Sequence, residues 1–292
     1  MRFIVFDKDR LGLLEGDEVV DVTSLLTVSP GPAGPLHRLI ERGETVEWSP
    51  DQLSDLPRRK RSEITCTAPF PRPPKIIAAP VNYLDHKAEM AYVRSIAELG
   101  IFLKASSSVI GPGEQVRLPY SDIRIDQEGE LTVVIGKTAH EVPVERALEH
   151  VFGYTCGLDM SVRSTEDRST RKSFDTFTPL GPVVVTADEI PDPGALSLET
   201  RVNGKVRQQA STRDLIFGVA ELVAYASSVM TLWPGDIILT GTPAGVGPVV
   251  DGDSIEVEIS EIGTLAVTVT SSSARPYTQR PGLPASVEGT AP

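Results

Sequence analysis

Runs of β-branched residues separated by turn-forming residues constrain the fold of this chain more than any other feature. From about residue 75 to 273 these runs recur without strict alternation with helical segments. A doubly wound parallel sheet requires such alternation and is therefore disfavoured. Aromatic residues make up only 5% of the chain, so the core must consist mainly of Val, Ile, Leu and Ala. We predict an α+β protein that is rich in β-strand.

Gly, Pro, Asp and Ser bound the expected elements, which makes each of them short. A proline-rich stretch near residue 70 indicates a boundary, and a Ser, Gly and Pro-rich segment after residue 271 indicates disorder. The predicted regions are a small N-terminal domain (1–70), a main domain (71–273) and a disordered tail (274–292). The expected strands are 2–6, 11–14, 19–22, 75–78, 131–135, 183–186, 237–240, 254–259 and 264–269, and the expected helices are 36–42, 83–99, 147–151 and 215–228.

The charge balance of the chain excludes some partners. A net charge of −12 argues against a nucleic-acid surface, which needs clustered Lys and Arg. It also repels anionic substrates, so an enzyme acting on them would need a local positive centre such as a bound cation. Cys66 and Cys156 lie far apart and form no metal-binding or disulfide pattern, which favours a reducing cytoplasm. No segment approaches the ~20 apolar residues that cross a bilayer, so we expect no membrane partner.

The segment 126–136, Asp-Gln-Glu-Gly-Glu-Leu-Thr-Val-Val-Ile-Gly, is the most informative for function. Alternate residues of a strand share a face, so Glu128 and Glu130 would project together, opposite to Leu131. Two such carboxylates repel each other unless a positive charge lies between them. Oxygen ligands of this kind suit Mg²⁺, Mn²⁺ or Ca²⁺ rather than zinc. The alternative is a solvated edge strand, which an isolated Glu-x-Glu pair in an acidic protein favours.

Three later segments favour the cation site. Residues 157–163 read Gly-Leu-Asp-Met-Ser-Val-Arg, residues 172–182 read Lys-Ser-Phe-Asp-Thr-Phe-Thr-Pro-Leu-Gly-Pro, and residues 234–243 read Pro-Gly-Asp-Ile-Ile-Leu-Thr-Gly-Thr-Pro. Together with the first segment, this ordered set resembles the fumarylacetoacetate hydrolase family over about residues 75 to 270. The resemblance implies rolled, mixed β-sheets with a small N-terminal domain, usually a homodimer, and a divalent cation, most often Mg²⁺ with Mn²⁺ or Ca²⁺ as alternatives.

The resemblance also implies roles for individual residues. Its metal ligands correspond to Glu128, Glu130 and Asp159. Lys172 would lie beside the cation, and Arg163 would pair with carboxylates at the substrate site. One loop would line the substrate pocket: Thr240, Gly241 and Thr242.

A further motif at 82–89, Asn-Tyr-Leu-Asp-His-Lys-Ala-Glu, supplies an acid–base pair. In a helix, His86 and Glu89 are at i and i+3 and share a face. A carboxylate beside an imidazole fixes its tautomer and raises its basicity, as activation of water requires. The alternative is an ordinary surface pair, but the motif resembles a lid element of the family that supplies the base. We expect the other histidines to be ordinary surface or core residues: His37, His140 and His150.

Two segments depart from the family pattern. Residues 79–83 read Ala-Pro-Val-Asn-Tyr, where the family often has Val-Gly-x-Asn-Tyr. Residues 164–171 read Ser-Thr-Glu-Asp-Arg-Ser-Thr-Arg and lack the Gln and Trp that commonly precede the lysine. We expect this loop to shape the substrate pocket, so the difference bears on the substrate and not on the metal site.

These residues predict hydrolysis of a carbon–carbon bond in a 2,4-dioxo acid of the acylpyruvate type. The 2-oxo acid end would chelate the cation, which stabilises a pyruvate enolate, while Lys172 adds positive charge and His86 activates water. The same site could instead serve an oxaloacetate-type decarboxylase or a 2-hydroxydienoate isomerase or tautomerase. A non-catalytic binding module with a structural cation is a further alternative, which the complete set of acidic and basic residues disfavours.

Overall fold

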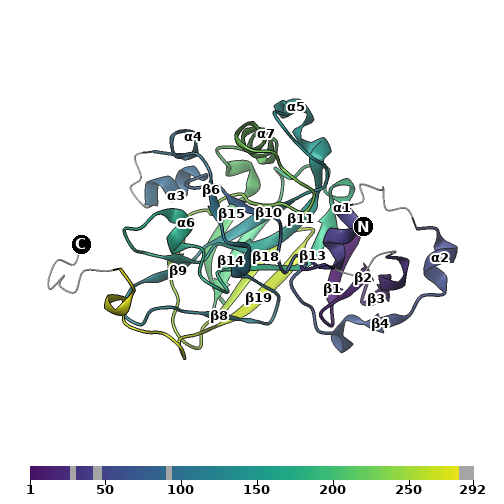
Figure 1. The fold of residues 1–292 in the computed structure, drawn as a ribbon, viewed down its shortest axis with the longest axis horizontal. Coiled ribbons are helices and arrows are strands. Elements are labelled where there is room, and N and C mark those ends of the chain that lie inside the picture. The colour runs from purple at the N-terminus through teal and green to yellow at the C-terminus, as the bar shows by residue number, and fades with distance from the viewer. Residues whose placement is uncertain (27–30, 42–47, 90–93, 283–292) are drawn as a thin grey trace.

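The computed structural model describes residues 1–26, 31–41, 48–89 and 94–282. Its strands form three sheets that run through the centre of the molecule, while short helices lie at the periphery (Figure 1). The predicted β-rich α+β fold is confirmed. Among the described residues, no helix combines the length and apolar character that a membrane span requires.

The largest sheet has 11 strands and is mixed, because most neighbours are antiparallel whereas β16 with β5 and β7 with β13 are parallel. Its order is β4 (Arg58–Lys60), β3 (Glu18–Asp21), β2 (Arg10–Glu15), β1 (Arg2–Phe6), β13 (Thr178–Thr186), β11 (Val151–Leu158), β10 (Gly129–Ile135), β16 (Ile237–Leu239), β5 (Ile76–Ala78) and β6 (Phe102–Lys104), with β7 (Val109–Ile110) beside β13.

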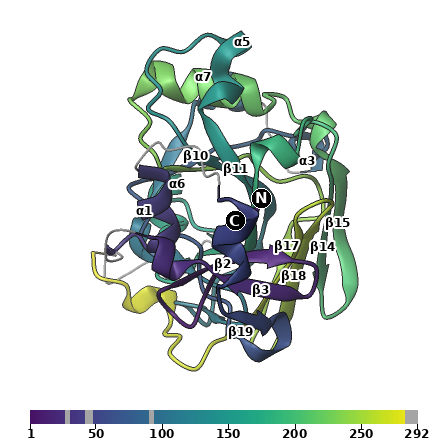
Figure 2. The same cartoon turned by 90° about the vertical axis from the view of Figure 1, so that its right-hand side faces the viewer.

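Two smaller sheets complete the strand layers, and Figure 2 shows strands of the larger one along one side of the molecule. The three-stranded sheet has the order β12 (Ser161–Val162), β9 (Ile125–Gln127) and β17 (Gly247–Pro248). The five-stranded sheet has the order β15 (Lys205–Ser211), β14 (Ser197–Val202), β18 (Ser254–Ile259), β19 (Gly263–Thr270) and β8 (Gln115–Arg117).

The longest described helix, α7 (Val219–Val229), buries Val219, Leu222, Val223 and Ala226, which recur at the spacing of one helical face. The other α-helices are α1 (Pro35–Glu41), α2 (Pro50–Ser54), α3 (Leu84–Glu89), α4 (Ile96–Leu99), α5 (Val144–Ala147) and α6 (Arg168–Arg171), and 3₁₀ turns span Thr23–Leu25, Arg61–Glu63, Ser106–Ser108, Leu148–His150, Ala187–Glu189, Thr212–Asp214 and Tyr277–Gln279.

Strand β10 is buried on both faces. Leu131, Val133 and Ile135 belong to the larger apolar cluster, as alternation predicted, whereas Val134 belongs to a second cluster with the N-terminal strands. A strand that is apolar on both sides is typical of the interior of a sheet. The elements that carry the predicted site are therefore fixed by packing from both sides.

Most predicted strands are present with bounds shifted by a few residues. The helix predicted over 83–99 is seen as α3 and α4, and residues 90–93 lie outside the described residues. The helix predicted at 147–151 is wrong at its end, because Val151 begins β11 and pairs with β10. The last residue of the helix predicted at 36–42 also lies outside the described residues.

Described segments near both ends of the chain contact the rest of the molecule. Residues 274–282 pack against the core. The rings of Tyr277 and Tyr120 lie 5.0 Å apart, and the backbones of Arg275 and Tyr120 form an isolated parallel β-bridge. The disordered tail predicted for 274–292 stays a prediction, and residues 283–292 lie outside the described residues. At the other end, β1 pairs with β13, so the N-terminal strands extend the large sheet. A domain boundary at residue 70 stays a prediction.

Candidate active site

Strand register brings the three predicted acidic ligands together. Gly129 in β10 pairs with Leu158 in β11, and Asp159 follows directly. The Asp159 amide donates a 2.9 Å hydrogen bond to the carbonyl of Glu128. As a result, ligand atoms of Glu128, Glu130 and Asp159 all lie within 4.8 Å of one another.

The two glutamates are not on one strand, as the sequence pattern had suggested. β9 ends at Gln127 and β10 begins at Gly129, so Glu128 lies between a strand of the three-stranded sheet and a strand of the large sheet. Glu128 is 5% exposed and Glu130 is 1% exposed. The solvated edge strand is therefore excluded, because both carboxylates are buried.

Two buried lysines neutralise part of this acidic cluster. Lys172 Nζ donates to Glu128 Oε2 at 2.7 Å and to Asp159 Oδ2 at 2.5 Å. Lys104 Nζ donates to Asp159 Oδ1 at 2.5 Å and to the Phe177 carbonyl at 2.9 Å. Burial lowers the pKa of Lys104 despite Asp159, whereas for Lys172 the charges of Asp159 and Glu128 outweigh burial and raise the pKa.

The carboxylates themselves are not equivalent. Burial, followed by the charge of Asp159, raises the pKa of Glu130 well above its usual range. Burial also opposes ionisation of Glu128, but Lys172 and Arg163 outweigh it and hold the pKa of that carboxyl far below its usual range. Glu130 is thus the carboxylate whose negative charge the folded protein compensates least, and an added cation would relieve it.

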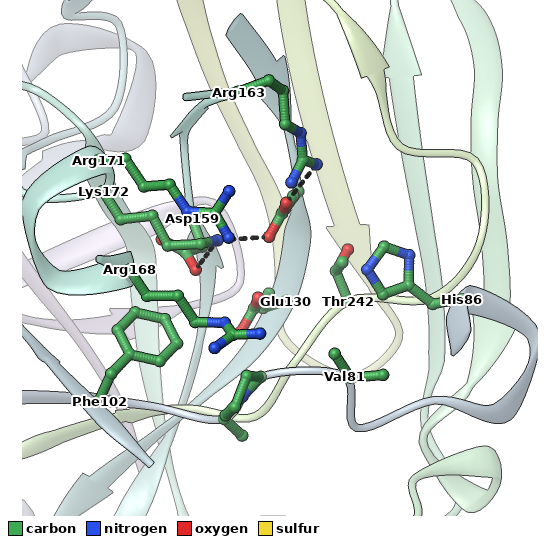
Figure 3. Close-up of a pocket in the computed structure, with 13 residues that line it drawn as sticks. Val81, His86, Phe102, Glu130, Asp159, Arg163, Arg168, Arg171, Lys172 and Thr242 are labelled. Atoms are coloured by element: carbon green, nitrogen blue, oxygen red, sulfur yellow. Dashed lines mark hydrogen bonds and ion pairs between the residues drawn. The ribbon is translucent and has the colours of Figure 1, made fainter. Parts of the chain in front are cut away.

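Arg163 lies behind the cluster as a partner of carboxylates. Its Nε donates to Asp126 Oδ2 at 2.6 Å and its Nη2 donates to Glu128 Oε1 at 2.7 Å. Pairing of Ser161 with Asp126 between β12 and β9 sets this position. Figure 3 shows Arg163 approaching the pocket from the side opposite to Phe102 and Val81. The structure therefore places Arg163 where it orients Glu128.

Hydrogen bonds fasten the loop after β16 to β10, beginning with the Thr240 amide, which donates to the Leu131 carbonyl at 3.1 Å. The Thr240 hydroxyl donates to the Leu131 carbonyl at 3.0 Å, and the Gly241 amide donates to Glu130 Oε2 at 2.7 Å. The Thr242 hydroxyl donates to a β10 carbonyl at 2.9 Å. Of these residues only Thr242 is among those that line the pocket. Direct substrate contacts of Thr240 and Gly241 stay a prediction, and the observed bonds favour a role in holding Glu130.

His86 and Glu89 lie on α3. His86 lies at the opposite side of the pocket from Lys172 (Figure 3). His86 is 5% exposed and lines the pocket, and its Nδ1 lies 3.5 Å from Glu89 Oε2. The Glu89 carboxylate also accepts the Gly245 amide at 2.9 and 3.1 Å. The two side chains share a helical face as predicted, and the imidazole points at the carboxylate site.

Asn82 fixes the beginning of this segment. Its Nδ2 donates to the carbonyls of Phe217 and Thr240 at 2.9 and 2.8 Å, and its Oδ1 accepts the Phe217 amide at 2.8 Å. The preceding residue, Val81, has φ of 50°, which is unusual for a β-branched residue, and it lines the pocket. The buried amide thus holds a strained segment beside the site.

Together these elements line a partly open pocket above the three carboxylates. Arg168 and Arg171 of α6 extend into it from the same side as Lys172 (Figure 3). Its lining residues are Ala79, Pro80, Val81, His86, Phe102, Glu128, Glu130, Asp159, Arg163, Arg168, Arg171, Lys172 and Thr242. Both segments that depart from the family pattern, 79–83 and 164–171, contribute to this wall, as predicted for the second.

Comparison with known proteins agrees with this geometry. The fumarylacetoacetate (FAA) hydrolase C-terminal family matches residues 75–270. The chain belongs to the fumarylacetoacetate hydrolase family.

Its relatives include several enzymes of that family. The chain is 46% identical to a maleylpyruvate hydrolase of Aquipseudomonas alcaligenes, over 93% of this chain and 100% of that protein. It is 39% identical to a mitochondrial oxaloacetate tautomerase of Rattus norvegicus, over 84% of this chain and 82% of that protein. A crystal structure of maleylpyruvate hydrolase from Sphingobium sp. SYK-6 with manganese(II) and pyruvate has a TM-score of 0.81 and 42% identity, covering 93% of this chain and 99% of that one.

The sequence patterns missed several members of this fumarylacetoacetate hydrolase site. Lys104 ends a short apolar run, Ile-Phe-Leu-Lys, and it is the buried residue of β6, in which Leu103 is exposed, so the sequence alone does not mark it. Asp126 lies inside the acidic motif, but its contact with Arg163 depends on pairing between β9 and β12. Arg168 and Arg171 lie in the loop whose difference from the family pattern was the available signal.

Proposed function

We propose that this enzyme is a divalent-cation-dependent hydrolase that cleaves the carbon–carbon bond of a 2,4-dioxo acid of the acylpyruvate type. The convergence of three buried carboxylates beside a buried lysine carries the proposal, since ligand atoms of Glu128, Glu130 and Asp159 lie within 4.8 Å of one another. A related hydrolase binds manganese(II) and pyruvate, and pyruvate is the product expected from an acylpyruvate.

The donor set fits a hard divalent cation. All three side chains offer carboxylate oxygens, which suit Mg²⁺ and Mn²⁺ better than soft metals. Burial, followed by the charge of Asp159, raises the pKa of Glu130, and a cation would offset that negative charge. Glu128, Glu130 and Asp159 would hold the ion, and when bound it supplies Lewis-acid stabilisation of charge on the substrate oxygens.

The reaction consumes one water: R–CO–CH₂–CO–COO⁻ + H₂O gives R–COO⁻ + CH₃–CO–COO⁻ + H⁺. The bond between C3 and C4 breaks, the hydroxyl of water goes to C4, and C3 gains a proton. We expect His86, whose Nδ1 lies 3.5 Å from Glu89 Oε2, to accept the proton of the attacking water. Lys172 supplies fixed positive charge where the substrate becomes more negative.

A tautomerase or isomerase is the second candidate, supported by the 39% identity to an oxaloacetate tautomerase. That reaction needs the same cation and a proton-transfer group but no attacking water. Decarboxylation of an oxaloacetate-type acid is a third use of the same residues. His86 and Glu89 suit all proton transfers, so they do not discriminate among these reactions.

The experiment compares chelator-stripped protein with protein reloaded with Mg²⁺ or Mn²⁺. Each form is incubated with acetylpyruvate, oxaloacetate and a 2-hydroxydienoate, and products are followed by NMR. We expect acetate and pyruvate from acetylpyruvate only when a cation is present. Exchange of the substrate's C3 hydrogens with solvent, or isomerisation of the double bonds, without cleavage would favour the second candidate. Equal activity of the stripped protein, or no turnover with cation bound, would contradict the proposal.

Three finer features belong to the proposal. Mg²⁺ is the expected physiological ion, and titrations with Mg²⁺ and Mn²⁺ compare the two. A homodimer and a cytoplasmic location follow from the family resemblance and the composition. Sedimentation velocity tests the dimer, and localisation of a tagged full-length protein tests the compartment.

A further inference from the structure

Gln208 is a buried polar residue on an exposed edge strand. It lies on β15, which is at one end of the five-stranded sheet. Its side chain is 1% exposed, whereas Arg207 and Gln209 on either side of it are exposed. A buried primary amide is stable only when its oxygen and its N–H groups have partners inside the protein. The partners of Gln208 therefore show what this buried amide holds in place.

The side-chain amide of Gln208 joins two segments of the candidate active site. Its Oε1 accepts the backbone amide of Gly129 at 2.9 Å, and Gly129 separates the two glutamates of the carboxylate centre. Its Nε2 donates to Thr242 Oγ1 at 2.6 Å and to the Pro243 carbonyl at 2.9 Å. One amide from the edge of another sheet thus holds both the start of β10 and the loop after β16.

The two backbone partners fix the orientation of this amide. The Gly129 N–H can only donate a hydrogen bond, and the Pro243 carbonyl can only accept one. The oxygen of Gln208 must therefore face Gly129, and its nitrogen must face Pro243. Because the same nitrogen lies 2.6 Å from Thr242 Oγ1, Gln208 is the donor and the threonine oxygen is the acceptor in that bond.

The Thr242 hydroxyl is consequently fixed in direction. A hydroxyl oxygen has one hydrogen and two lone pairs. The hydrogen of Thr242 is donated to the Gly129 carbonyl at 2.9 Å, and one lone pair accepts the Gln208 amide. The second lone pair is left for the pocket, which Thr242 lines. Thr242 therefore offers the pocket a hydrogen-bond acceptor and not a donor.

The position of Thr242 gives this polarity a use. Figure 3 shows Thr242 between Glu130 and the imidazole of His86, and all three residues line the same pocket. A ketone or carboxylate oxygen of a substrate brings no hydrogen, so it does not pair with an acceptor. A water molecule brings two hydrogens, of which the proposed base takes only one. The other hydrogen needs an acceptor, and Thr242 supplies it.

We infer that Gln208 is a positioning residue that makes Thr242 the acceptor for the second hydrogen of the attacking water. The inference rests on the proposed hydrolysis and adds how the water is oriented. The water oxygen bonds to C4, His86 accepts one proton, and the other hydrogen stays on that oxygen in its bond to Thr242. With both hydrogens held by the protein, a lone pair of the water is directed at C4.

The first test measures binding alone, so it does not depend on the reaction. Mn²⁺-loaded protein is titrated calorimetrically with 4-hydroxy-2-oxopentanoate and with 2-oxopentanoate, which differ only in a C4 hydroxyl that mimics the attacking water. We expect the hydroxylated acid to bind about three- to tenfold more tightly, as one hydrogen bond implies. Thr242→Val should abolish that preference and Thr242→Ser should retain it. Gln208→Met should reduce it, because the hydroxyl of Thr242 is then free to turn.

Thr200→Val is the matched control. Thr200 on β14 is a second buried threonine beside Gly129, since a Cβ atom added to that glycine would lie 2.0 Å from Thr200 Oγ1. Its hydroxyl has no hydrogen-bond partner among the described residues, and it is not among the residues that line the pocket. We expect this substitution to leave the preference for the hydroxylated acid unchanged.

The second test separates water attack from enolate formation. With acetylpyruvate we expect Thr242→Val to lower kcat about tenfold or more and Gln208→Met to lower it less, with KM changed less than about twofold. Exchange of the C3 hydrogens of pyruvate in D₂O needs no attacking water, so its Mn²⁺-dependent rate should change less than about threefold in both variants. An equal loss of cleavage and of exchange would overturn the inference, because it would show a general disturbance of the site.

The outcomes of the binding test distinguish this inference from the proposed function. Equal affinity of the wild-type protein for the two acids, or an equal loss of affinity for both in Thr242→Val and Gln208→Met, would overturn the assignment even if acylpyruvates are cleaved. A preference for the hydroxylated acid that depends on Thr242 and Gln208, together with no cleavage of acetylpyruvate, would support the acceptor assignment while the proposed hydrolysis fails.

Discussion

The carboxylate centre and the α3 segment differ in how the fold holds them. Glu130 and Asp159 are 1% and 2% exposed, and paired strands and buried lysines fix the centre. On α3, Leu84 is 68% exposed and the Glu89 side chain is 34% exposed. A helix with few buried contacts opens more easily than a central strand. The proposed cation site and the proposed base therefore lie in parts of different local stability, and their contributions should be separable by mutation.

Loss of one ligand should give the largest effect. Glu130→Gln keeps an acceptor for the Gly241 amide but removes a charged oxygen from the centre. Because metal catalysis is worth several kcal/mol, we expect activity to fall at least about 10³-fold. Metal content after dialysis should fall in parallel. Full Mn²⁺ occupancy with unchanged activity would show that Glu130 is not a ligand.

Two substitutions at the carboxylate centre should change the free energy of unfolding of the metal-free protein in opposite directions. Asp159→Asn removes the partner of Lys104 and one partner of Lys172, so we expect the free energy of unfolding to fall by about 3 kcal/mol or more. Glu130→Gln removes a carboxyl whose pKa is raised, mainly by burial, so we expect greater stability at pH 8. Chemical denaturation of chelator-treated protein measures both. Destabilisation of similar size in both variants would contradict the inequality of the carboxylates.

The pH dependence of metal-free stability follows from the same carboxyl. In the folded protein the pKa of Glu130 is raised above its ordinary value of 4.5, which applies to the unfolded chain. The contribution of Glu130 to the free energy of unfolding is therefore fully present below about pH 4.5. It is lost as the pH rises through the folded-state pKa. The advantage of Glu130→Gln should therefore grow from pH 4.5 upward. A constant difference across that window would be inconsistent with the raised pKa.

Loss of the imidazole should leave the cation in place. His86→Asn removes the proposed base, and a positioned base typically contributes about 10²-fold or more to the rate. We expect kcat to fall by about that factor while Mn²⁺ affinity changes less than about twofold. A fall in Mn²⁺ affinity together with kcat would contradict this prediction, because it would show that α3 supports the carboxylate centre.

The smallest effect is expected from the partner of that imidazole. Glu89→Gln keeps hydrogen bonding to the Gly245 amide but removes the charge 3.5 Å from His86 Nδ1. We expect a fall in kcat of about tenfold, because the carboxylate that orients the imidazole is replaced by a neutral amide. Glu149→Gln, at an exposed surface pair with Arg146, is the matched control. An unchanged kcat would show that the charge of Glu89 does not support His86.

Sequence patterns predicted what depends on local chemistry. The period-two alternation of Leu131, Val133 and Ile135 identified the buried strand, and the acidic motif around Glu130 identified the centre. They did not predict where one strand ends and the next begins, because Glu128 differs from a strand residue only in its tertiary surroundings.

Sequence patterns also did not predict contacts between segments that are far apart along the chain, because these contacts depend on tertiary structure. Lys104 meets Asp159 because β6 ends near the end of β11, and no spacing along the chain encodes that approach. The helix predicted over 83–99 combined α3 and α4, since both have helical composition. In contrast, the family resemblance grouped Glu128, Glu130 and Asp159, which do converge in the structure, because it carries tertiary information that a single pattern lacks.

The position of Glu128 between β9 and β10 has a mechanical consequence. An ion gripped by this carboxylate together with Glu130 and Asp159 would cross-link the three-stranded sheet to the large one at a single point. Movement of one sheet relative to the other would then disturb the bound ion. Ion occupancy and the rigidity of the contact between the two sheets should therefore increase together. An ion bound there would therefore also stabilise the packing of the two sheets against each other.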